Sequence, residues 1–112
     1  MGVQAKICGL TTAEAVQAAL GGGAAFVGFM FFARSPRNVA PEAAARLAEP
    51  VRGKAGIVAV MVDPDDADAD RIAQALRPDF VQLHGAETPA RARAVAERMG
   101  AGLIKVPSRR QD

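Results

Sequence analysis

The chain has 112 residues, 50% of them hydrophobic, which is enough apolar material for one domain with a modest core and too much for a disordered tail. The net charge of +2 comes from basic residues dispersed among acidic ones, without Trp or Tyr to stack on bases, so we expect no nucleic-acid partner. With no signal peptide and no apolar stretch of about 20 residues, we expect no membrane anchor. A single cysteine cannot form an internal disulfide, which fits the reducing cytoplasm.

Short apolar runs alternate with longer amphipathic runs along the chain. The apolar runs, which we predict to be strands, cover residues 3–7, 25–30, 56–62, 80–83 and 103–106. The amphipathic runs, which we predict to be helices, cover residues 12–20, a stretch that opens at 41, a stretch from the acidic turn at 63–66 to about 76, and 89–99. Near-continuous apolar strands are typical of parallel strands covered on both faces, so the sequence predicts a βα repeat with a parallel sheet.

Capping residues mark several helix boundaries. Thr11 and Glu14 have the spacing of a capping box at the start of the first helix, and the three glycines at 21–23 end that helix. Thr88 is predicted to be the N-cap of the fourth helix, with Pro89 at its first position.

Two architectures fit four βα units and a fifth strand. A doubly wound sheet of five strands needs little more than this length, whereas a (β/α)8 barrel takes about 250 residues, so that this chain would form half of one. Length alone favours the doubly wound sheet. We expect one domain over residues 1–106 and an irregular tail at 107–112, because the apolar pattern ends at Val106.

Reactive side chains follow the predicted strands. In either architecture the carboxyl ends of parallel strands form one edge, so we expect Cys8, Arg37, Asp63 and His84 to converge there. A lone Cys is most often a packing residue, but a thiol near a helix N-terminus or a cation can act as a general base. Arg37 suits the capture of a carboxylate, and His84, the only histidine, suits either a hydrogen-bonded turn or a ligand contact.

An acidic run from Asp63 to Asp70 is best explained by the N-terminus of a helix, and nothing shows the paired spacing of metal ligands, so we expect no metal. Asp63 and Lys105 also suit a receiver module, which accepts a phosphoryl group on an aspartate after its third strand. Receivers carry an acidic pair after the first strand and a small hydroxyl residue after the fourth, where this chain has Cys8 and His84. A non-catalytic, receiver-like module of five strands is the alternative.

Four motifs lie at or just after the ends of the predicted strands: residues 6–11 (KICGLT), 28–31 (GFMF), 35–37 (SPR) and 82–85 (QLHG). Together they closely resemble the phosphoribosylanthranilate isomerase family of tryptophan biosynthesis. The resemblance implies a (β/α)8 barrel, of which this chain holds about half, with five strands and four helices. It therefore outweighs the argument from length.

The resemblance also implies an activity, an Amadori rearrangement of the small-molecule substrate N-(5'-phosphoribosyl)anthranilate. The ribose ring opens and the product is 1-(2-carboxyphenylamino)-1-deoxyribulose 5-phosphate. By the same resemblance, Cys8 is the general base that takes the proton from ribose C2, Arg37 binds the anthranilate carboxylate, and His84 lines the site. No cofactor and no metal are implied.

The chain departs from the family at Ala25, where an acidic residue is usual, and at Asp63, where Asn is common. The family's general acid is an aspartate on a strand beyond the fifth, and its phosphate site lies in the loops after strands seven and eight. Neither falls within these residues. We therefore expect a half barrel with little or no isomerase activity alone, which self-associates or pairs with a complementing C-terminal half.

Overall fold

The computed structural model describes residues 6–85 and 87–104. Strands and α-helices alternate along the chain, and one short 3-10 helix, η1, follows the second α-helix. The elements are β1 (Lys6–Cys8), α1 (Ala13–Gly21), β2 (Phe26–Phe31), α2 (Pro41–Ala48), η1 (Glu49–Val51), β3 (Gly56–Met61), α3 (Asp66–Leu76), β4 (Phe80–Leu83), α4 (Pro89–Met99) and β5 (Gly102–Ile104). The predicted βα repeat is confirmed. The strand residues predicted at 3–5 and 105–106 and the tail predicted at 107–112 lie outside the described residues.

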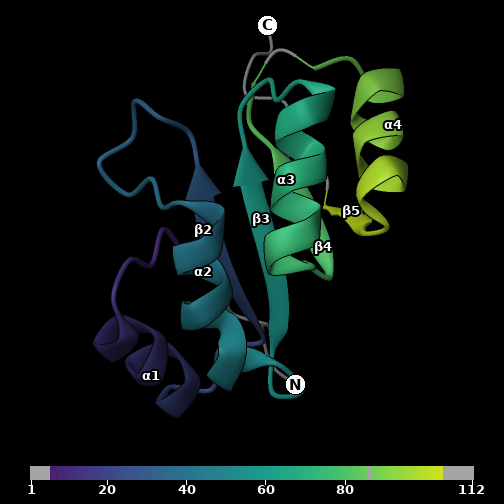
Figure 1. The fold of residues 1–112 in the computed structure, drawn as a ribbon. Helices are drawn as coiled ribbons and strands as arrows, with labels where there is room; N and C mark the ends of the chain where they lie inside the picture. The colour runs from purple at the N-terminus through teal and green to yellow at the C-terminus, as the bar shows by residue number, and fades with distance from the viewer. Residues whose placement is uncertain (1–5, 86, 105–112) are drawn as a thin grey trace, which may run out of the picture.

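The strand order distinguishes the two architectures. The sheet runs β1-β2-β3-β4-β5, and every neighbouring pair of strands is parallel. A doubly wound sheet reverses its order next to β1, and its helices cover both faces. Here the order is sequential and the four α-helices lie on one face of the sheet (Figure 1). The doubly wound sheet, and with it the receiver-like alternative, is therefore wrong, and the order is that of half a (β/α)8 barrel.

The hydrophobic core lies between the sheet and the helices. Ile57, Ala59 and Met61 of β3 are at most 1% exposed and belong to this core. Each helix adds at least one fully buried side chain to it: Val16 in α1, Ala44 in α2, Leu76 in α3 and Val95 in α4. Burying a side chain the size of Leu or Met contributes about 1.5–3 kcal/mol, so this layer holds the helices on the sheet.

The opposite, concave face of the sheet also carries buried apolar side chains. Val58 and Val60 of β3 point away from the helix-side core and are fully buried. The rings of Phe26 and Phe80 meet edge to face, with centroids 5.5 Å apart, across Gly56. A Cβ at Gly56 would lie 2.8 Å from the Phe26 ring and 3.3 Å from the Phe80 ring, so this position requires a residue without a side chain. Burial on both faces explains why the strands are continuous apolar runs.

The N-cap of α4 is the predicted residue, whereas the N-cap of α1 is not. Thr88 caps α4, since its Oγ1 accepts a hydrogen bond from the Arg91 N–H at 3.1 Å. The capping box predicted at Thr11 is wrong, because Thr12 is the N-cap of α1 and its Oγ1 accepts from the Ala15 N–H at 3.1 Å. The helix therefore begins one residue later than the predicted position 12.

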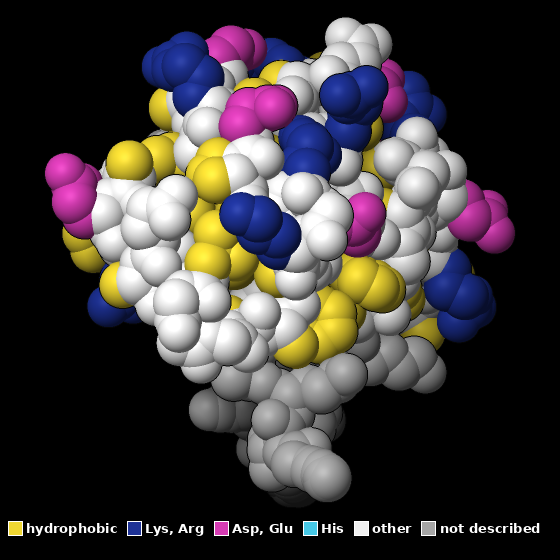
Figure 2. All heavy atoms as spheres, turned by 90° about the horizontal axis from the view of Figure 1, so that it is seen from below, with side chains coloured by type: hydrophobic (Ala, Val, Ile, Leu, Met, Phe, Trp, Pro, Cys, Tyr) yellow, Lys and Arg dark blue, Asp and Glu magenta, His cyan; other side chains and the backbone are white. Residues whose placement is uncertain are grey.

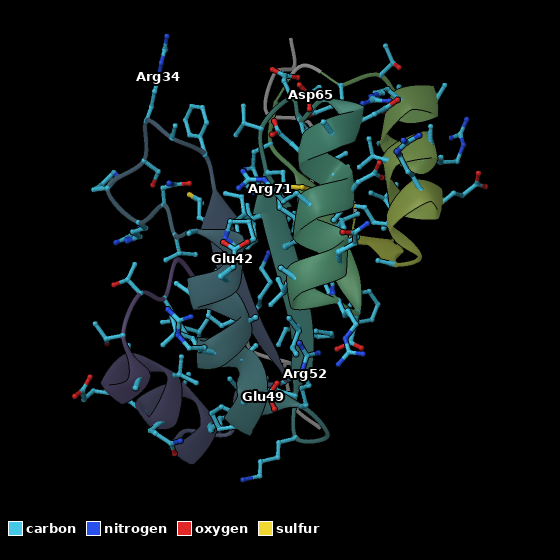
Figure 3. The ribbon with its side chains drawn as sticks, viewed as in Figure 1. Arg34, Glu42, Glu49, Arg52, Asp65 and Arg71 are labelled. Atoms are coloured by element: carbon cyan, nitrogen blue, oxygen red, sulfur yellow. The ribbon has the colours of Figure 1, made fainter. Side chains whose placement is uncertain are left out.

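Polar contacts join the elements at the N-terminal edge of the sheet. The Asp79 carboxylate accepts a hydrogen bond from the Ile57 N–H at 2.8 Å, and the Asp79 carbonyl accepts one from the Gly102 N–H at 3.0 Å. Arg52, which lies near this edge in Figure 3, donates to the carbonyl of Leu76 at the end of α3. These contacts tie β3, β4, β5 and α3 together at the end of the sheet opposite the strand C-termini.

Charged side chains are mixed over the surface. On the described part of the face seen in Figure 2, Lys and Arg side chains are interspersed with Asp and Glu, without an extended area of one sign. Within residues 6–85 and 87–104, none of the helices has the length and apolar character needed to cross a bilayer.

Candidate functional site

The C-terminal ends of the strands bring the predicted site residues to one edge of the sheet. Cys8 is the last residue of β1, Arg37 lies in the loop between β2 and α2, Asp63 follows β3, and His84 follows β4. Because neighbouring strands are parallel, these four positions share an edge, as the sequence predicts. Cys8, Arg37 and His84 are all exposed there.

Cys8 and Arg37 are brought together through the backbone of Gly9. Gly9 has a φ of +81°, and a Cβ at this position would lie 2.6 Å from Arg37 Cδ and 3.4 Å from Arg37 Nε. The arginine side chain therefore lies directly over the residue that follows the thiol. On the neighbouring strand, a Cβ at Gly28 would lie 2.8 Å from Cys8 Cβ, so the absence of a side chain there leaves room for the cysteine.

The loop that carries Arg37 is fastened to β2. The Ser35 hydroxyl accepts a hydrogen bond from the Arg37 N–H at 3.0 Å, and the Met30 carbonyl accepts one from the Val39 N–H at 3.1 Å. Asn38 forms an isolated parallel bridge with Met30. These backbone contacts hold the Cα atom of Arg37 in place, and a loop residue that binds a ligand needs such a rigid support.

His84 is anchored by its backbone and by a neighbouring amide. Its N–H donates to the Met61 carbonyl at 2.9 Å, and its Nε2 lies 2.5 Å from Nε2 of Gln82. The other end of the Gln82 amide, Oε1, accepts a hydrogen bond from Lys6 Nζ. This row of three side chains connects β1 to β4 across the concave face.

Lys6 and Gln82 are polar residues to which sequence reasoning assigned no role. Both lie inside the motifs at 6–11 and 82–85, and both interrupt apolar strands, which was the signal that could have found them. Gln82 is only 4% exposed. A buried amide on an apolar face needs hydrogen-bond partners, so its two contacts account for its presence there.

Asp63 lies beside Gly85, between β3 and the loop after β4. Its φ of 43° is left-handed, and its N–H donates to Glu87 Oε2 at 2.6 Å. A Cβ at Gly85 would lie 2.6 Å from the Asp63 carboxylate, so that carboxylate packs on the backbone next to His84. Asp63 therefore contributes to the shape of the loop that carries His84.

The rest of the acidic run has a structural role, as predicted. The Asp65 carboxylate caps α3 by accepting from the Asp68 N–H at 2.8 Å. Asp66 pairs with Arg91 at 2.9 Å, and Asp70 accepts two hydrogen bonds from Arg98 of α4, at 2.8 and 2.9 Å. The hydrogen bonds from Arg98 lower the pKa of Asp70, and the same contact raises the pKa of Arg98.

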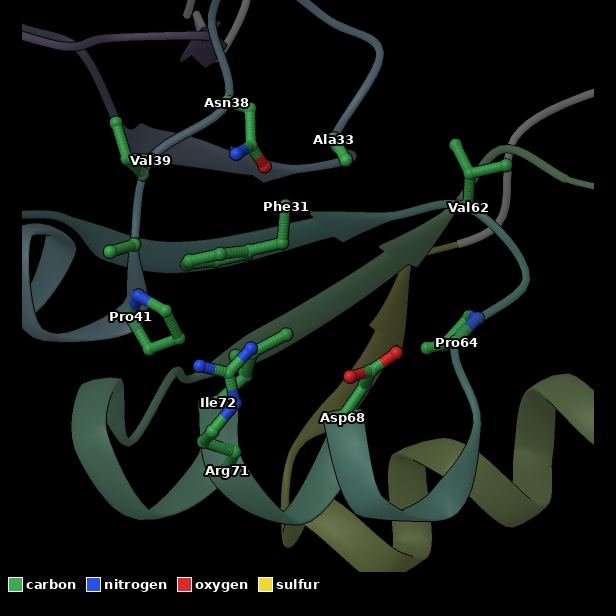
Figure 4. A pocket seen from close by; sticks show the side chains of 11 residues that line it. Phe31, Ala33, Asn38, Val39, Pro41, Val62, Pro64, Asp68, Arg71 and Ile72 are labelled. Carbon is green, nitrogen blue, oxygen red and sulfur yellow. The ribbon is translucent and has the colours of Figure 1, made fainter.

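A pocket of about 350 Å³ opens near the same edge on the helix side of the sheet. It lies between the loop before α2 and the start of α3, with Phe31 along its floor and with Asp68 and Arg71 on its wall (Figure 4). None of Cys8, Arg37 and His84 lines it. These three residues lie instead at or after the C-terminal ends of β1, β2 and β4.

Within the described ranges, no group of three or more His, Cys, Asp and Glu side chains is arranged to hold a metal ion. The edge carries a thiol, a guanidinium and an imidazole, with the Asp63 carboxylate beside them. These groups can remove a proton, bind a carboxylate and donate or accept a hydrogen bond.

Comparison with known proteins identifies the family. The family model described as N-(5'phosphoribosyl)anthranilate (PRA) isomerase matches residues 5–108. The N-(5'-phosphoribosyl)anthranilate isomerase of Caulobacter vibrioides is 63% identical over 103 residues, which are 90% of this chain and 47% of the relative. The chain thus spans about half the length of the curated relatives it matches.

Solved structures agree with this assignment. The crystal structure of phosphoribosyl anthranilate isomerase from Thermotoga maritima superposes with a TM-score of 0.84 at 34% identity, over 93% of this chain and 50% of that one. A second structure of such an isomerase, in complex with reduced 1-(o-carboxyphenylamino)-1-deoxyribulose 5-phosphate, has the same TM-score and identity and covers 93% of this chain and 53% of that one. Sequence and fold agree, and the chain belongs to the N-(5'-phosphoribosyl)anthranilate isomerase family.

Proposed function

We propose that this chain supplies the first half of an N-(5'-phosphoribosyl)anthranilate isomerase site. The site converts its substrate to 1-(2-carboxyphenylamino)-1-deoxyribulose 5-phosphate once the second half of the barrel completes it. The proposal depends on one observation: the Arg37 side chain lies against Gly9, the residue after Cys8, at the C-terminal edge of the sheet. The chain belongs to a family of isomerases that act on this substrate. We also propose that the half barrel comprises residues 1–106 and that the protein is cytoplasmic, since a single thiol suits a reducing compartment.

Each residue has a role in the rearrangement. As the ribose ring opens, the C1–O bond breaks and the ring oxygen takes a proton, and C2 must then lose its proton so that the amino-ketone can form. Cys8 is the base that takes the C2 proton. Arg37 holds the anthranilate carboxylate through its planar pair of N–H donors, and His84 donates a hydrogen bond to the substrate. A relative in the same family binds a reduced form of the product, which supports this choice of ligand.

The described residues supply a base but no partner for the ring oxygen. The resemblance implies a general acid on a strand beyond the fifth and a phosphate site in the loops after strands seven and eight, so residues 1–112 alone should show little turnover. Losing one acid or base commonly costs about 10² to 10⁴ in rate, and losing the phosphate anchor adds a loss of positioning.

The edges and the concave face of the sheet make the second half its natural partner. Among the described strands, β1 and β5 lie at the two edges of the sheet, and Ile7, on the helix side of β1, is 41% exposed. An unpaired strand edge with an apolar side chain promotes association. We propose that the chain binds a complementing C-terminal half and self-associates without one, and sedimentation of the chain with and without that half tests this. A monodisperse monomer that melts cooperatively by itself would contradict it.

Complementation tests the function. Residues 1–112 are mixed with the separately produced C-terminal half of the Caulobacter vibrioides relative, and the loss of substrate fluorescence is followed. We expect activity in the mixture and little in either half. Cys8→Ala in the mixture should lower kcat by about 10² or more. No turnover from a mixture that has formed a folded complex would contradict the proposed function.

Arg34 provides a matched control for Arg37. Both lie exposed in the loop after β2, and Arg34 extends outward from the ribbon in Figure 3. Arg37→Gln should raise KM by about 10- to 150-fold, which corresponds to the free energy of a hydrogen bond to a charged group. Arg34→Gln should leave KM unchanged. Equal effects of the two substitutions would show only a general loss of positive charge.

A further inference from the structure

Among the described residues, Gln82 is the one buried residue that has a polar side chain. It lies on the concave face of β4, and both ends of its amide are in contact with a polar partner. Lys6 Nζ donates to its Oε1, and His84 Nε2 lies 2.5 Å from its Nε2. The amide is therefore placed between a charged residue on β1 and a histidine at the edge that carries the proposed site.

The hydrogen-bonding capacity of each group determines where the protons lie. A lysine ammonium can only donate, so the amide atom that faces Lys6 must be the oxygen. The amide nitrogen then faces His84, and an amide NH2 can only donate as well. His84 Nε2 must therefore accept, and the proton of the neutral ring is on Nδ1. With a proton on Nε2, two donors would face each other at 2.5 Å.

We propose that Gln82, oriented by Lys6, is a positioning residue that holds His84 as the neutral Nδ1–H tautomer. The side chain of His84 is exposed, and its backbone is fixed by the hydrogen bond to Met61. Its Nδ1–H is then the donor that the site offers to an oxygen of the substrate, such as a carboxylate or a hydroxyl. This last step rests on the proposed function, whereas the tautomer does not.

The tautomer can be measured directly, because His84 is the only histidine in the chain. A two-dimensional 1H–15N spectrum of the imidazole distinguishes a protonated ring nitrogen from an unprotonated one. In the complemented barrel we expect Nδ1 to be protonated and Nε2 to be unprotonated. A protonated Nε2 in the unsubstituted protein would overturn the proposal.

Gln82→Glu tests the amide. The carboxylate has the same shape, still accepts from Lys6, and cannot donate, so we expect the ring proton to move to Nε2. Gln74→Glu makes the same change at an exposed position of α3 and should leave the tautomer as it is. If Gln82→Glu does not fold, Lys6→Met gives a second test, because the freed amide can turn its oxygen toward His84 and the Nε2–H tautomer should gain population. A folded variant of either kind with an unchanged tautomer would overturn the proposal.

Kinetics of the complemented barrel separate the positioning role from a purely structural one. Gln82→Glu should raise KM by about two- to tenfold, the value of one hydrogen bond, and should change kcat less. A changed tautomer with an unchanged KM would overturn the role in substrate binding. An inactive complex that shows the expected tautomer would instead count against the proposed function alone.

Discussion

Adding one methyl group at Gly9 should weaken the site through Arg37. Gly9 adopts a φ of +81°, where a residue with a Cβ costs about 1–2 kcal/mol. For the complemented barrel, which is about twice the length of this chain, that lowers Tm by about 2–8 °C. The new Cβ of Gly9→Ala would also lie 2.6 Å from Arg37 Cδ, so the arginine must move from its position over Gly9. Moving a carboxylate-binding guanidinium should raise KM by about 10- to 150-fold.

Gly23 supplies the matched control for this prediction. It has the same φ of +81°, and no atom lies within 4 Å of a Cβ built there. Gly23→Ala and Gly9→Ala should therefore lower the free energy of unfolding by similar amounts, measured by urea titration of the complemented barrel. Only Gly9→Ala should raise KM in the fluorescence assay.

A double substitution shows whether the effect passes through Arg37. In an Arg37→Ala background, Gly9→Ala should no longer change KM, because the side chain that it displaces is absent. Equal KM values for Gly9→Ala and Gly23→Ala, or an undiminished effect of Gly9→Ala without Arg37, would show that the methyl group does not act through Arg37.

Three further outcomes follow from the packing, the caps and the charges. Met61→Ala removes a fully buried side chain from the helix-side core and should cost about 2–5 kcal/mol of unfolding free energy in urea titrations. Thr12→Ala should lower the free energy of unfolding by about 1 kcal/mol, because it removes the N-cap of α1, while Thr11→Ala should change it by no more than about 0.5 kcal/mol. A larger loss for Thr11→Ala would instead support a capping box at Thr11. The hydrogen bonds from Arg98 lower the pKa of Asp70 below 3.8, so the stabilisation is present above that pH and is lost as the pH falls through the lowered pKa. Asp70→Asn should therefore lower stability at neutral pH, but not at a pH below the lowered pKa, and the loss should shrink in high salt because the pair is exposed.

Local features were predictable because they depend on neighbouring residues. β4 was predicted at 80–83 and is found at Phe80–Leu83, and α4 ends at Met99 as predicted, before Gly100 in the left-handed conformation. The first helix cap was missed by one residue, since two adjacent threonines can each serve as the N-cap and local sequence does not distinguish them.

The strand order could not be read from the chain's periodicity. The doubly wound sheet and the half barrel use the same βα units, and they differ only in which strands become neighbours. Length favoured the wrong one, and the motifs around Cys8 and His84 favoured the right one. The sequence thus predicted the architecture only through its resemblance to a family.

The sequence predicted which residues lie at the candidate site, but not which side chains are in contact there. Its edge of the sheet follows from the parallel strands, so Cys8, Arg37 and His84 lie where strand ends should place them. The hydrogen bond from Lys6 to Gln82 joins residues 76 positions apart, and it depends on how strongly the sheet curves. No local pattern encodes such a distance.

Gly56 and Gly102 would also limit which second half can take part in the proposed complementation. Gly56 leaves room for the rings of Phe26 and Phe80, and a Cβ at Gly102 would lie 2.9 Å from the Phe80 ring. Large and small residues thus alternate on the concave face, and in a complemented barrel the remaining volume would be filled by the second half. In hybrids assembled from halves of different relatives, the total side-chain volume of this layer should decide compatibility more than overall sequence identity does. If the second half places a larger residue against Phe26 and Phe80, it would need a smaller residue at the neighbouring position of the same layer.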